Sequence, residues 1–147
     1  MRLLSRSVRL LPMVAFAAMI GCSSDVPSVT PVEGVVIING KTAPNVLIQF
    51  NPSSWPEGTP VIGASALSDT EGRYALVCPD GRKGAPIGKH KVTLIDNNLN
   101  VEDEPKITAK RIVNRVPMTY LSPGSTPLEI VVEVGKKDYD LIVGAKK

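Results

Sequence analysis

Aromatic residues are scarce in this chain of 147 residues, which has one Trp, three Tyr and two Phe. A hydrophobic core must therefore be built mainly from Val, Ile and Leu, and the length predicts one domain with a core of modest size. Cysteine is scarce as well, because the chain has only Cys22 and Cys78. If Cys22 carries a modification, no internal disulfide can form and the fold must be stable without one.

Histidine is limited to His90, which restricts the catalytic and metal sites that the chain can build. One His and one spare Cys argue against zinc, and the acidic pairs lack the ordered ligand spacing of a calcium loop. The sequence also has no Gly-x-Ser-x-Gly elbow, no phosphate-cradling glycine loop and no Cys/His metal spacing. We therefore expect a chain that is not an enzyme and has no metal or cofactor. A hydrolase built around His90 stays open, since triad members need only meet in space.

An excess of charge of one sign is also absent from most of the chain. The formal net charge is +3, but Arg2, Arg6 and Arg9 all lie in the first ten residues. Without these three, the 17 basic residues become 14, which equals the 14 acidic residues. A nearly neutral chain is not expected to bind the phosphate backbone of nucleic acid.

The N-terminal segment has the pattern of a bacterial secretory signal peptide. A basic start precedes an apolar run at residues 10–20, and this run is shorter than the roughly 20 residues of a membrane-spanning helix. The following residues, Met19, Ile20, Gly21 and Cys22, resemble a lipobox, the motif in which the cysteine is lipidated and the chain is cut just before it. The alternative is ordinary secretion with cleavage after Ala17.

The lipobox resemblance predicts a signal peptide at 1–21, a tether at 22–31 and a domain at 32–147. Stable anchoring needs more than one acyl chain, and the lipid groups implied for Cys22 would meet that need. The residues directly after Cys22, Ser23 and Ser24, include no early acidic retention signal. We therefore expect a location in the bacterial cell envelope, anchored in the outer membrane and facing the periplasm or the cell surface.

The domain itself reads as all-β, a single antiparallel Greek-key sandwich of about seven short strands. In the stretch 68–96, a turn beginning at Asp69 precedes one strand, and a Gly/Pro-rich corner precedes another in which His90, Val92 and Leu94 alternate with polar residues. Asn39-Gly40 is a hairpin signal at the end of strand 32–39. Further strands are expected at residues 45–51, 61–68, 128–134 and 139–143.

Two irregular segments, 52–60 and 97–115, are expected to be surface loops. Trp55 lies in the first loop, either as a hydrophobic plug that folds back onto the sandwich or as an exposed ring that stacks on a sugar or a partner. The plug is favoured because a buried indole contributes a large apolar area. Trp55 and Tyr120 are the candidate ligand or partner contacts, while His90 is expected to be a half-buried packing residue.

Several motifs resemble the carboxypeptidase-regulatory-like, transthyretin-related domains of bacterial envelope lipoproteins. They comprise residues 34–46, 69–76 and 88–94 and, near the end of the chain, 116–120, 126–128 and 138–141. These motifs are turn and strand features that cover almost all of the mature chain. The resemblance implies a transthyretin-like or Ig-like sandwich and an accessory or structural module, with no catalytic residues to carry over.

The leading functional prediction is thus a noncatalytic, lipid-anchored envelope module that presents loops 52–60 and 97–115 to an envelope protein or a glycan. Its first partner would be the membrane, reached through the lipid on Cys22. An alternative is a carrier or sensor of a small ligand or carbohydrate, because Trp55 and Tyr120 lie in loop regions. The pattern leaves the oligomeric state open.

Overall fold

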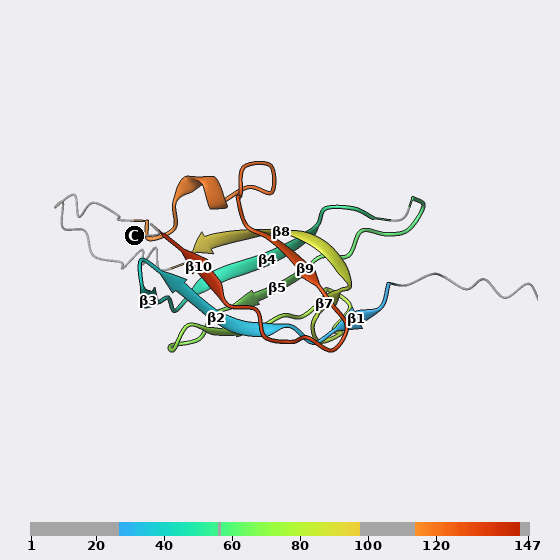
Figure 1. Cartoon of the computed structure of the whole chain (residues 1–147), viewed down its shortest axis with the longest axis horizontal. Coiled ribbons are helices and arrows are strands. Elements are labelled where there is room, and N and C mark those ends of the chain that lie inside the picture. The colour runs from blue at the N-terminus through green and yellow to red at the C-terminus, as the bar shows by residue number, and fades with distance from the viewer. Residues whose placement is uncertain (1–26, 56, 98–113, 145–147) are drawn as a thin grey trace, which may run out of the picture.

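The computed structural model describes residues 27–55, 57–97 and 114–144, and the predictions made for the signal peptide, the lipobox and most of loop 97–115 lie outside them. Within this part the protein is all-β, with strands joined by turns and one short 3-10 turn, η1 (Met118–Tyr120). The strands form two four-stranded sheets (Figure 1). Apolar side chains from both sheets meet in one core, so the expected sandwich-like architecture is present.

One sheet has four strands in the order β5-β4-β8-β9, and all its neighbours are antiparallel. Its members are β4 (Val46–Pro52), β5 (Ala64–Leu67), β8 (Gly88–Asp96) and β9 (Glu129–Val132). β4 and β8 pair over seven residues and form the centre of this sheet.

The other four-stranded sheet is built around β2 (Glu33–Ile38). β2 pairs with β3 (Lys41–Thr42) and β6 (Arg73–Ala75) in antiparallel fashion, but with β10 (Leu141–Val143) in parallel. The prediction of a wholly antiparallel sandwich is therefore wrong at this pair. Two parallel neighbouring strands need a long connection between them. The chain between β2 and β10 is long enough, because it also forms the strands of the opposite sheet.

A third, two-stranded sheet pairs β1 (Val29–Thr30) with β7 (Ala85–Pro86). β1 lies within residues 22–31, the segment expected to be a tether. The described part of that segment is therefore attached to the domain by strand pairing.

Two turns match their sequence signals. Asn39 and Gly40 both have positive φ, 52° and 77°, as a type I′ turn between β2 and β3 requires. The Asp69 carboxylate accepts hydrogen bonds from the amides of Glu71 and Arg73 at 2.9 and 2.8 Å, so the side chain caps the turn before β6. Both local predictions are confirmed.

The core consists mainly of Val, Ile and Leu, as the scarcity of aromatics predicts, with Phe50 as its largest fully buried side chain. His90, Val92 and Leu94 point inward from β8, as their alternation predicts. Thr93, which was expected to point to solvent, is buried on the other face of β8. The polar side chains of Gln49 and Asn51 on neighbouring β4 cover its hydroxyl, at 3.3 and 3.4 Å.

The two ends of the sandwich contain different segments of the chain. At one end, which we call the tether end, lie residues 27–31, the segments 53–55, 57–63 and 79–87 and the turn 133–138. At the other, which we call the clamp end, lie the Asn39-Gly40 turn, the Asp69 turn, the end of β8 and residues 114–116. Figure 1 shows the described chain beginning at the tether end, beside β1 and β7.

Candidate functional site

The predicted lipid site cannot be placed, because Met19, Ile20, Gly21 and Cys22 lie outside the described residues. The structure does place both candidate contact aromatics. Trp55 is half-buried in the loop after β4, at the tether end, and its indole Nε1 is buried without a hydrogen-bond partner among the described residues. Its exposure is thus intermediate between that of a plug and that of an open stacking ring.

Tyr120 lies in η1 and is also half-buried, because its ring packs against the core. η1 contacts β8 on one side of the sandwich, whereas the loop of Trp55 extends from the end of β4. Figure 1 shows the two segments well apart, so Trp55 and Tyr120 do not line a common surface.

The tether end is fastened by backbone contacts between segments that are distant in the sequence. Besides the β1–β7 pairing, the amide of Ile87 donates to the carbonyl of Ser28 at 3.0 Å. The guanidinium of Arg82 donates to the carbonyl of Pro27 at 2.7 Å. The chain that follows the predicted lipid site therefore joins the sandwich at a fixed place.

His90 is fully buried near the same end, more deeply than the half-buried position that was expected. Its Nε2 lies 2.7 Å from the carbonyl oxygen of Pro86, which requires the Nε2–H tautomer to donate this bond, and its ring packs against Phe50. Nδ1 has no hydrogen-bond partner among the described residues. Burial lowers the pKa of His90, so the ring is neutral and links β8 to β7.

Cys78 is also buried, and its Sγ lies 3.5 Å from the carbonyl oxygen of Gly84. Burial raises the pKa of this thiol. A nucleophilic cysteine needs a depressed pKa, so the environment of Cys78 suits a small packing residue.

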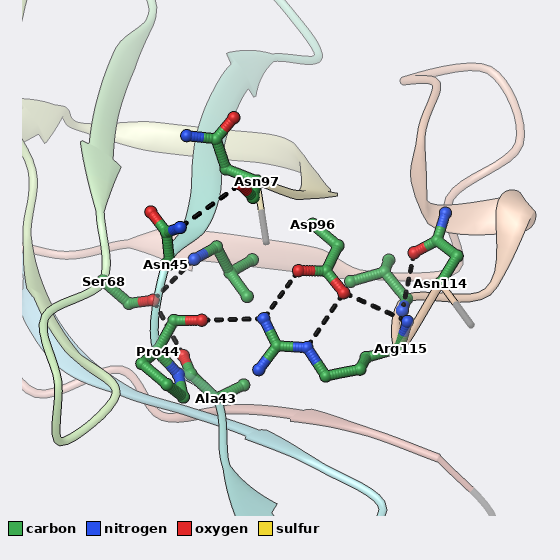
Figure 2. Close-up of polar contacts among 10 residues, drawn as sticks. Ala43, Pro44, Asn45, Ser68, Asp96, Asn97, Asn114 and Arg115 are labelled. Atoms are coloured by element: carbon green, nitrogen blue, oxygen red, sulfur yellow. Dashed lines mark hydrogen bonds and ion pairs between the residues drawn. The ribbon is translucent and has the colours of Figure 1, made fainter. Parts of the chain in front are cut away.

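The clamp end holds a polar cluster around Asp96 and Arg115 (Figure 2). The guanidinium of Arg115 donates to both oxygens of the Asp96 carboxylate, at 2.6 Å from Nη2 and 2.9 Å from Nε. The same Nη2 donates to the carbonyl of Pro44 at 2.8 Å, and the backbone amide of Arg115 donates to Asp96 Oδ2 at 3.1 Å. We call this arrangement the Asp96–Arg115 clamp.

The clamp is shielded from water to a large extent, since the side chain of Asp96 is only 4% exposed and that of Arg115 is 30% exposed. The nearby carboxylate and its hydrogen bonds raise the pKa of Arg115. Because Asp96 ends β8 and Arg115 is the last residue of the predicted loop 97–115, the clamp closes the base of that loop.

Neighbouring polar residues extend the cluster. The Ser68 hydroxyl donates to the carbonyl of Ala43 at 2.8 Å and accepts the amide of Val46 at 2.9 Å. Asn45, whose φ is 59°, donates through Nδ2 to the carbonyl of Asn97 at 3.2 Å. These contacts hold the connection between β3 and β4 against the end of β8, as Figure 2 shows.

An open hollow of about 450 Å³ adjoins the clamp. It is lined by Ile38, Asn39, Lys41, Thr42, Ala43 and Arg115. Arg115 binds Asp96 and Pro44 through Nε and Nη2, so these two nitrogens are already engaged within the fold.

The clamp was not predicted from the sequence, because Arg115 was placed in the surface loop 97–115. A usable signal was present in the register of β8. Asp96 continues the inward series of His90, Val92 and Leu94. A carboxylate at an inward position requires a cationic or amide partner, and Arg115 supplies both.

The described residues also lack some recognisable kinds of site. No group of three or more His, Cys, Asp or Glu residues there could hold a metal ion, and no helix there has the length and apolarity needed to cross a membrane. Comparisons of the chain with protein-family models, with curated proteins and with solved structures find no match.

Proposed function

We propose that this chain is a noncatalytic, lipid-anchored module of the bacterial cell envelope, a Greek-key sandwich of the carboxypeptidase-regulatory-like type. Lipid on Cys22 anchors it, and its sandwich presents the clamp end, at the base of loop 97–115, to an envelope protein or a glycan. Loop 52–60, which was expected to be presented as well, follows β4 at the tether end and is not part of the proposed partner surface. The signal-peptide pattern and the lipobox resemblance support the anchor.

One arrangement carries the proposal: the anchored and the presented segments are at opposite ends. The described chain begins at the tether end, where Pro27 and Ser28 are bound to the loop 79–87. The Asp96–Arg115 clamp closes the base of the loop 97–115 at the other end. Since β8 has nine residues at about 3.3 Å each, roughly 30 Å separates the ends. A surface at this distance from the lipid is open to a partner.

The anchor is tested by intact mass spectrometry of the protein extracted from membranes, together with cell fractionation. We expect the wild-type chain to begin at Cys22 and to carry lipid, and Cys22→Ser to become soluble or to stay uncleaved. Cys78→Ser is the matched control, because Cys78 is buried in the domain and its loss should leave the lipid in place. A wild-type chain that begins at residue 18 without lipid would refute the anchor.

The presented surface is tested by placing a photo-crosslinking residue at Lys41, which is exposed at the clamp end, in the intact envelope. The control position is Lys83, which is exposed in the loop 79–87 at the tether end. We expect a defined protein or glycan adduct from Lys41 and no such adduct from Lys83. Adducts from Lys83 alone would show that the presented end has been assigned the wrong way round.

A further inference from the structure

Apolar side chains reach solvent at the tether end. Val61 is 68% exposed, Ile87 is 42% exposed and Val134 is 78% exposed. They come from three separate segments, the loop after β4, the residue between β7 and β8 and the turn after β9. With half-buried Trp55 they form what we call the tether-end patch.

The contacts of the strands bring these segments together at one end. Ile87 is hydrogen-bonded to Ser28, next to the first described residue. The amide of Ser53, two residues before Trp55, donates to the carbonyl of Lys89 at 2.8 Å. Val132, two residues before Val134, is paired with Gly88. The segments that carry the patch therefore lie at the same end of the sandwich as the place where the chain joins it.

The position of Cys22 in the sequence indicates that a bilayer would face this patch. This step rests on the proposed lipid anchor. Four residues, Ser23 to Val26, separate Cys22 from Pro27. Even a fully extended chain from Cys22 to Pro27 spans only about 18 Å. A lipid on Cys22 therefore holds the tether end near the bilayer, and the clamp end, roughly 30 Å away along the strands, lies farther out.

The composition of this end suits the boundary between headgroups and acyl chains. Tryptophan and apolar side chains gain from contact with that boundary, and lysine stems extend toward headgroups. Positive and negative charges at this end balance each other. Arg82 forms an ion pair with Asp80 at 2.7 Å, and Lys89 forms one with Glu129 at 2.7 Å. The charge of exposed Lys83 is matched by that of exposed Glu57. Apolar contact, rather than attraction to anionic lipid, would therefore drive binding.

We propose that the tether-end patch of Trp55, Val61, Ile87 and Val134 rests on the surface of the bilayer that holds the lipid of Cys22. The patch is small, so it acts only once the anchor has brought it to the membrane. Its contact fixes the orientation of the sandwich and directs the clamp end away from the bilayer.

Trp55 is the only tryptophan, which makes it an intrinsic probe for this contact. The full mature protein, extracted from membranes, is reconstituted into phosphatidylcholine vesicles whose acyl chains carry bromine either near the headgroup or near the methyl end. We expect shallow bromines to quench Trp55 fluorescence more strongly than deep ones. Adding phosphatidylglycerol should leave the quenching unchanged.

The test variant is Ile87→Glu/Val134→Glu, and the matched control is Leu67→Glu/Ile142→Glu, whose residues are exposed outside the patch. We expect the test variant to lose the difference between shallow and deep bromines and the control to keep it. Urea unfolding confirms that each variant is folded, which is expected because all four side chains are exposed.

The outcomes separate the inference from the proposed function. A mass that shows lipid on Cys22, combined with no bromine quenching of Trp55, overturns the membrane contact alone. A chain without lipid overturns both. Equal quenching in the test and control variants also overturns the contact. So does sedimentation showing a dimer that only Ile87→Glu/Val134→Glu dissociates, because the patch would then bind a second copy.

Discussion

The two ends of the sandwich are fastened by different chemistry. The clamp end is closed by a buried ion pair, in which Arg115 also binds the carbonyl of Pro44. The tether end is closed by backbone pairing of β1 with β7, by the bond from His90 to Pro86 and by the close approach of the chain at Gly84. The tether end leaves apolar side chains exposed, whereas the clamp end holds the buried carboxylate of Asp96 paired with Arg115.

The two ends therefore differ in kind: one contains a buried ion pair, and the other has apolar side chains on its surface. A buried ion pair often adds little net stability, but it specifies one geometry because its partners cannot be left unpaired. It is therefore suited to fixing the base of a loop. Exposed Val and Ile side chains do not fix geometry, but they lower the free energy of contact with an apolar partner. Substitutions at each end should reveal whether the two ends differ in this way.

The largest effect is expected for Arg115→Met, which leaves the carboxylate of Asp96 buried without its cation. We expect a loss of about 3 kcal/mol in the free energy of unfolding, measured by urea denaturation. The double variant Asp96→Leu/Arg115→Met removes both charges and should recover part of the loss. If Arg115→Met lowered the free energy of unfolding by less than about 1 kcal/mol, the clamp would be as weak as a solvent-exposed ion pair. The two ends would then not differ in how they are fastened.

At the tether end, Gly84→Ala is expected to be the most damaging small change. Gly84 has a φ of 113°, and a Cβ added there would overlap the carbonyl oxygen of Thr30 at the end of β1. We expect a loss of about 2 kcal/mol, because strain and a backbone shift at the β1–β7 pairing combine. Gly81→Ala is the control: Gly81 has a φ of 86° in open space, so only about 1 kcal/mol should be lost there. If Gly84→Ala and Gly81→Ala lost equal stability, the close contact of Gly84 with β1 would contribute nothing to holding β1 in place.

Much of the fold could be predicted because its signals are local. Asn39-Gly40 and Asp69 set their turns through conformations and bonds within a few residues. The inward series of β8 follows from its alternation alone. The parallel pairing of β10 with β2 could not be predicted, because the two strands are about a hundred residues apart. No residue within either strand indicates which strand it pairs with.

The candidate site was less predictable for a related reason. Arg115 meets Asp96 across 19 residues of sequence, and it was expected to belong to a surface loop. Trp55 and Tyr120 were selected for residue type and loop position, but which surfaces they share depends on the whole topology. The Cys22 prediction depends only on adjacent residues, and its test is chemical rather than structural.

His90 should make stability depend on pH, and the sign follows from its burial. The unfolded ring takes up a proton near the ordinary pKa of 6.5, whereas burial lowers the pKa of the folded ring. The unfolded state therefore binds more protons below pH 6.5, and stability falls as the pH drops through this region, by at most about 1.4 kcal/mol per pH unit. Urea denaturation between about pH 5 and 7 measures this slope above the main range of carboxylate titration.

His90→Gln is the control for the pH effect. Its amide can still donate to the carbonyl of Pro86, but it does not titrate, so the slope should disappear even if the variant is less stable. An unchanged slope in His90→Gln would assign the pH dependence to other groups, because His90 is the only histidine.

The smallest effect is expected for Glu129→Gln, which removes the carboxylate that binds Lys89 at 2.7 Å and Lys91 at 3.2 Å. Lys89 lowers the pKa of Glu129, but the side chain is 38% exposed and the pairs are screened by salt. We expect a barely measurable change in the urea midpoint at low salt and none at high salt. Arg115→Met should keep its full effect at high salt, because the clamp is shielded from water. If both variants lost their effects at high salt, burial would not distinguish the clamp from the ion pairs on the surface.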